Sequence, residues 1–97
     1  MRNTAAKQAR AFGAKVTQQR RTDGKPLAGY YIYTGVNFTA KFNSAACETS
    51  YWEVDLWDDN ASEVVINEFR QDNMFERKTD VLWALLCLDR DINTTKI

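Results

Sequence analysis

The chain of 97 residues contains no histidine and only two cysteines, Cys47 and Cys87, which lie far apart in the sequence. Without histidine it cannot assemble the usual zinc ligand sets or pair a cysteine nucleophile with an imidazole base. It also has no glycine-rich phosphate loop, and the acidic run Asp58-Asp59-Asn60 lacks the glycine and distal glutamate of a calcium loop. These absences predict a protein that is not an enzyme and holds no metal or cofactor.

Long apolar runs are also missing, and the longest extends only from Val81 to Leu88. A membrane-spanning helix needs about 20 consecutive apolar residues, so no membrane partner is expected. The sequence shows no signal-peptide pattern, which favours a cytoplasmic location where thiols stay reduced. Cys87, inside the apolar run, is therefore predicted to be a buried core thiol, and a single disulfide with Cys47 is the alternative.

Proline and glycine are scarce, with one and four residues respectively, while 44% of the chain is hydrophobic and 27% is charged. This composition is typical of a globular protein, and a chain of this length fills one core. We expect a single α+β domain over residues 1–97. It should contain an antiparallel sheet of three to four strands, an N-terminal basic helix and a C-terminal apolar helix.

The helical part of this prediction depends on apolar spacing near the two ends of the chain. Apolar residues recur every three to four positions from Thr4 to Arg21, which predicts a helix that ends before the turn residues 22–26. Thr79–Leu88 predicts a second helix with Thr79 as its cap, and the polar tail Asp89–Ile97 is expected to fray.

Alternation of apolar and polar residues predicts the strands between these helices. Gly29–Thr34 and Val36–Phe42 are expected to form a hairpin around Gly35, and Tyr51–Trp57 is the clearest single strand. Glu63–Arg70 fits either a helix capped by Ser62 or a fourth strand. Its run of β-branched residues favours the strand.

The net charge of zero conceals two segments of opposite sign. Residues 1–28 carry seven basic residues against one acid, a net charge of +6, whereas residues 48–80 carry ten acids against three basic residues, a net charge of −7. Such charge asymmetry governs how fast a protein associates with a partner and which partner it binds. Both segments therefore yield hypotheses about binding.

The leading hypothesis places the functional surface in the acidic segment. On the expected strand 51–57, alternation places Glu53, Asp55 and Trp57 on the face opposite the apolar residues, and the following turn adds Asp58 and Asp59. An exposed tryptophan among carboxylates is typical of a contact surface, and fixed carboxylates can imitate a phosphate backbone. These five residues predict a binding or inhibitor protein that engages a basic, nucleic-acid-handling protein partner.

The first alternative is nucleic-acid binding through the basic segment. Arginine and lysine side chains would neutralise phosphates, and tyrosines of the hairpin would stack on bases. The residues concerned are Arg2, Lys7, Arg10, Lys15, Arg20, Arg21, Tyr31 and Tyr33.

Pairing of the two charged segments in a homodimer is a further alternative. The small size, mixed charge and lack of histidine are shared with compact inhibitors of phages and mobile elements, a likeness of composition that serves only to order these hypotheses.

Overall fold

A computed structural model of the chain describes residues 4–45 and 51–95. Over these ranges the backbone forms three helices and one four-stranded antiparallel sheet. The elements in chain order are α1 (Thr4–Phe12), β1 (Lys15–Arg20), β2 (Pro26–Thr34), β3 (Thr39–Ala45), β4 (Tyr51–Val54), α2 (Glu63–Phe69) and α3 (Lys78–Thr95). The predicted α+β class is confirmed, with a basic helix at the start and an apolar one at the end.

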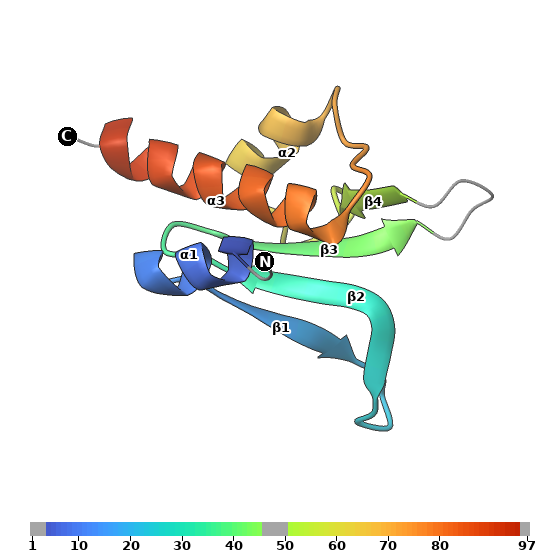
Figure 1. Cartoon of the computed structure of the whole chain (residues 1–97). Coiled ribbons are helices and arrows are strands. Elements are labelled where there is room, and N and C mark those ends of the chain that lie inside the picture. The colour runs from blue at the N-terminus through green and yellow to red at the C-terminus, as the bar shows by residue number, and fades with distance from the viewer. Residues whose placement is uncertain (1–3, 46–50, 96–97) are drawn as a thin grey trace.

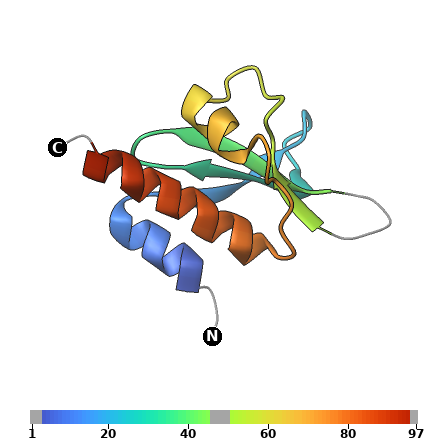
Figure 2. The ribbon, with the colours of Figure 1, turned by 90° about the horizontal axis from the view of Figure 1, so that it is seen from above.

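The strands follow one another in sequence order across the sheet. In Figures 1 and 2, α1 and α3 lie on one face of the sheet, and α2 lies beyond its β4 edge. Figures 1 and 2 show α1 and α3 side by side over that face. The hairpin predicted around Gly35 is present as β2 and β3, where Tyr33 lies opposite Ala40 and Tyr31 lies opposite Phe42. Val36 belongs to the connecting loop rather than to a strand.

The core lies between the sheet and the helices. Phe42 at its centre is fully buried, and its ring stacks on Tyr31 with centroids 5.7 Å apart. Val54, Val65 and Leu85 bring β4, α2 and α3 into the same cluster. Because burial of each large side chain contributes about 1.5 to 3 kcal/mol, this face of the sheet holds the helices in place.

The predicted helix Thr4–Arg21 is wrong in its second half, because Gly13 ends α1. This glycine has a φ of +110°, a conformation that favours glycine at a helix C-terminus. The Gly13 N–H donates to the Arg10 carbonyl at 3.1 Å and the Ala14 N–H to the Ala9 carbonyl at 2.8 Å, which closes a Schellman motif. Residues 15–20 are consequently strand β1, so the basic residues are divided between a helix and a strand.

Residues 63–70 are also corrected, from a strand to the short helix α2. Val65 and Phe69, four positions apart, are both buried against the core, and this helical spacing outweighs the β-branched run. The expected strand 51–57 is shorter than predicted, because β4 ends at Val54 and a turn follows.

The C-terminal helix is longer than predicted at both ends. It begins at Lys78, so Thr79 lies inside the first turn, and it continues through residues expected to fray as far as Thr95. Asp89 is completely buried within it.

Cys87, predicted to be a buried thiol, is an exposed free cysteine, while Cys47 lies outside the described residues. Among the helices of residues 4–45 and 51–95, none combines the length and apolar character needed to cross a membrane.

Candidate interaction surface

The edge of the sheet at β4 is covered by a segment of the same chain. Phe75 pairs with Trp52 through two backbone hydrogen bonds of 2.7 and 2.9 Å. The side-chain amide of Asn73 then accepts from the Val54 N–H at 2.7 Å and donates to the Val54 carbonyl at 2.8 Å. These bonds satisfy the outward-facing backbone N–H and C=O groups of Trp52 and Val54. They hold this edge of the sheet up to the turn that follows β4.

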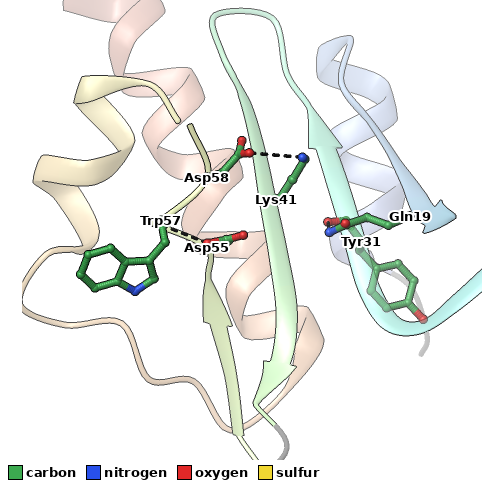
Figure 3. Close-up of polar contacts among 6 residues, drawn as sticks. All are labelled: Gln19, Tyr31, Lys41, Asp55, Trp57 and Asp58. Carbon is green, nitrogen blue, oxygen red and sulfur yellow. Dashed lines mark hydrogen bonds and ion pairs between the residues drawn. The ribbon is translucent and has the colours of Figure 1, made fainter. Parts of the chain in front are cut away.

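The turn after β4 is held by hydrogen bonds and an ion pair (Figure 3). The Asp55 N–H donates to the Lys41 carbonyl at 2.8 Å, and the Asp55 carboxylate accepts from the Trp57 N–H at 3.0 Å. The Lys41 ammonium lies 3.2 Å from the Asp58 carboxylate. The Ala61 N–H also donates to the Asp58 carbonyl at 2.9 Å. The turn is therefore tied to β3 at two places, which orders its backbone.

The tryptophan on this turn projects into solvent. The Trp57 side chain is 92% exposed, and in Figure 3 its indole points away from Lys41 and the neighbouring strands. Leu56, next to it, packs against the core instead. Solvent exposure of Trp57, which the leading hypothesis required, is thus present, although the residue lies on a turn rather than on a strand face.

The four acidic residues predicted for this surface have different environments. Asp59 is exposed, and Glu53 is half-buried on β4 with its carboxylate 3.4 Å from the Asn43 amide. Asp55 uses its carboxylate to hold the turn, and the Asp58 side chain is only 17% exposed beside Lys41. Trp57 and Asp59 are therefore presented to solvent, while Asp55 and Asp58 mainly fix the turn that presents them.

Met74 belongs to the same side of the molecule and was not predicted from the sequence. It lies between Asn73 and Phe75, and the pairing of this segment with β4 places it opposite Glu53. Its side chain is 65% exposed. No periodic pattern surrounds Met74 in the sequence, so only the observed pairing reveals it. We call Glu53, Asp55, Trp57, Asp58, Asp59 and Met74 the β4-side surface.

The residues of the alternative hypothesis are only partly brought together. Lys7 and Arg10 on α1, Lys15 and Arg20 on β1, and Arg21 in the next turn are all exposed, and Arg2 lies outside the described residues. The two tyrosines face the helices instead of solvent.

Tyr33 is completely buried and donates its hydroxyl to the Asp89 carboxylate at 2.8 Å. Burial, together with the hydrogen bond to Asp89, raises the pKa of Tyr33 far above its usual value. Tyr31 is half-buried, stacks on Phe42, and has the Lys78 ammonium 3.9 Å from its ring centroid. In this arrangement neither ring offers a free face on which a base can stack.

Comparisons with known proteins provide no further guide to function. The chain matches no protein-family model, no curated protein and no solved structure. Within residues 4–45 and 51–95 there is also no group of three or more histidine, cysteine or acidic side chains placed to hold a metal ion. The functional argument therefore depends on the geometry of the chain's own surface.

Proposed function

We propose that this is a non-enzymatic binding protein whose β4-side surface engages the basic surface of a protein partner. The observation that carries the proposal is the 92% exposed indole of Trp57, held on an ordered turn. A large apolar side chain in this position is costly to leave in water, and tryptophan is among the residues most enriched at the energetic centres of interfaces.

Order in the turn supports this role because it lowers the entropic cost of binding. The backbone around Trp57 is fixed by the Asp55 carboxylate and by the Lys41–Asp58 ion pair before any partner arrives. Rigid presentation leaves mainly the side-chain rotamers to be ordered on association. Met74 offers a second exposed apolar contact on the same side of the sheet.

The charge around the indole supports a basic partner. Asp59 is exposed two residues after Trp57, Glu53 lies on the preceding strand β4, and the segment 48–80 carries a net charge of −7. Carboxylates at fixed positions attract lysine and arginine and can compete with phosphates for a groove that handles nucleic acid. A protein of this kind would act as an inhibitor by covering that groove.

Replacing Trp57 with alanine is expected to weaken partner binding by about ten-fold or more, because truncation of an anchor residue costs about 2 kcal/mol. The measurement is capture of proteins from a lysate of the source cells on immobilised wild-type and variant protein, followed by titration of the captured protein. Tyr30→Ala is the matched control, since Tyr30 is an exposed aromatic on β2, which β3 separates from β4. Equal loss for both variants would remove Trp57 from the site.

Charge is tested separately with Asp59→Lys against Asp23→Lys. Both residues are exposed, and Asp23 lies in the turn between β1 and β2 at the other side of the sheet. Asp59 is preferred to Asp55 or Asp58, because substitution of those two would disturb the turn itself. Loss of capture only with Asp59→Lys supports the acidic surface, and equal capture by both variants argues against it.

A further inference from the structure

The opposite edge of the sheet, at β1, is open where the β4 edge is covered. In the described chain β1 pairs only with β2, and no other segment of residues 4–45 and 51–95 lies along its outer side as a strand. An open edge presents unpaired backbone donors and acceptors to solvent. The β1 edge is therefore the place where an additional strand would join this sheet.

The pairing pattern identifies which backbone groups of β1 face outward. The Lys41 carbonyl accepts from Asp55, so at Lys41 the backbone groups of β3 point to β4. Alternation along antiparallel strands then directs the groups of Tyr31 and Tyr33 to β3 and those of Ile32 to its β1 partner, Thr17. The N–H and C=O groups of Val16 and Gln18 consequently point to the free edge.

A cavity of about 190 Å³ lies beside this edge, between β1, α1 and the first turn of α3. Three consecutive β1 residues, Val16, Thr17 and Gln18, contribute to its wall, so it reaches the strand backbone. Ala6, Tyr31 and Leu82 supply apolar lining, and Lys78 and Thr79 supply polar groups. Small-molecule sites usually exceed about 300 Å³, so the size suits a single side chain better than a whole ligand.

Charge selects the kind of segment that fits here. Lys15 and Arg20 lie at the two ends of β1, Lys7 and Arg10 are exposed on α1, and Lys78 lines the cavity. A second copy paired antiparallel on β1 would bring the basic residues at the ends of the two strands close together, and like charges that meet across strands are destabilising. An acidic segment would instead be attracted to β1, because its carboxylates would lie along a basic edge.

We infer that β1 is a docking edge for an extended acidic segment of a partner protein, which adds a strand to the sheet and places one apolar side chain in the cavity. In such strand addition, backbone hydrogen bonds supply affinity and pockets for alternate side chains supply specificity. This site is separate from the β4-side surface, at the other end of the strand order. It does not depend on the function proposed for that surface.

The test uses Gln18→Pro, which removes an outward N–H without removing a backbone hydrogen bond to β2. Proline is tolerated on edge strands where its missing N–H would face solvent. Gln18→Ala is the matched control, since it removes the same side-chain bond to the Leu27 carbonyl but keeps the N–H. Circular dichroism and thermal melting establish that both variants are folded before binding is measured.

The probe is a capped, fluorescein-labelled peptide of alternating Glu and Val, long enough to pair with all of β1, with binding followed by fluorescence anisotropy. We expect Gln18→Pro to weaken binding about ten-fold relative to Gln18→Ala, because an interfacial hydrogen bond is lost and the entering strand is displaced. A peptide with Lys in place of Glu should not bind. Amide exchange of Val16 and Gln18 should slow only when the Glu peptide is present.

Several outcomes would overturn the inference. Absence of binding by the Glu peptide, or equal affinity of Gln18→Pro and Gln18→Ala, would exclude strand addition at β1. Equal binding of the Lys peptide would exclude selection by charge. Tighter binding of an oligothymidylate than of the Glu peptide at near-physiological salt would assign the basic side to nucleic acid instead.

Discussion

Asp89→Ala is expected to lower the free energy of unfolding by about 3 kcal/mol or more, a large share of the roughly 5 to 15 kcal/mol typical of a domain. The Asp89 carboxylate is fully buried and accepts hydrogen bonds from the Tyr33 hydroxyl, the backbone N–H groups of Val36 and Asn37, and the Asn37 side chain, at 2.8 to 2.9 Å. Alanine removes this shared acceptor from a protected site, although the Asn37 side chain keeps its bond to the Asp89 carbonyl oxygen. Each donor left unsatisfied there costs about 1 to 3 kcal/mol.

The measurement is urea unfolding followed by circular dichroism, with Tyr33→Phe as the control. That variant removes one of the donors and leaves the carboxylate with the others, so we expect a loss of about 1 kcal/mol. The midpoint should fall further for Asp89→Ala than for Tyr33→Phe while the slope stays constant. If the two variants lose the same stability, Asp89 does not hold the β2–β3 loop against α3.

Gly35→Ala is expected to destabilise the protein by about 3 kcal/mol through overpacking. A Cβ at this position would lie 2.3 Å from an Asp89 carboxylate oxygen, 2.6 Å from Cε2 of Tyr33 and 2.9 Å from the Phe38 carbonyl oxygen. All three are closer than a Cβ normally approaches, and two of the groups belong to the Asp89 network. The added methyl group must therefore displace that network.

Gly24→Ala, measured in the same unfolding experiment, shows how much stability is lost to backbone strain without steric crowding. Gly24 has a φ of +88° in the turn between β1 and β2, and no atom lies within 4 Å of a Cβ built there. We expect a loss of about 1 kcal/mol from the left-handed conformation alone. A loss for Gly35→Ala no larger than that for Gly24→Ala would show that the space around Gly35 adapts.

The hairpin and the exposed tryptophan could be predicted because both follow from local patterns. Aromatic and β-branched residues flank Gly35 with a period of two, which defines β2 and β3 without knowledge of distant contacts. Alternation also placed Trp57 opposite the buried Val54 and packed Leu56. That prediction holds although β4 ends early, because the Asp55 turn keeps the indole outside.

The first helix shows where local patterns mislead. Phe12 and Val16 fit a helical spacing, so the predicted helix continued through Gly13, which lies between them. Its positive φ and the Schellman bonds make it the end of α1 instead. The four apolar positions of the predicted helix, Ala5, Ala9, Phe12 and Val16, carry too little signal to distinguish a continued helix from a helix followed by a strand.

The burial and hydrogen bonding of Asp89 could not be predicted, since its partners lie more than fifty residues earlier in the chain. A carboxylate after an apolar run normally indicates a solvated helix end, so residues 89–97 were expected to fray. Only the fold brings the loop around Val36 and Asn37 to this side chain. The same is true of Met74, whose place on the β4-side surface depends on pairing between Phe75 and Trp52.

Parts of the two oppositely charged sequence segments lie at opposite sides of the sheet. Lys7, Arg10, Lys15 and Arg20 of the first segment lie on α1 and β1. Glu53 and Asp59 of the second segment lie on and after β4. Two strands separate the edges, so direct pairing of the two charged sides within one molecule does not account for the asymmetry. Binding at each side can therefore be tested separately.

The most direct test of the proposed function is photo-crosslinking from a benzophenone amino acid placed at Asn60, an exposed residue three positions after Trp57. Val36, exposed in the β2–β3 loop, provides the control position. After irradiation in a lysate of the source cells and mass spectrometry, we predict a protein adduct from position 60 alone, with the crosslink in a lysine- or arginine-rich surface of a nucleic-acid-handling protein. No adduct from position 60, or an adduct to nucleic acid itself, would contradict the account.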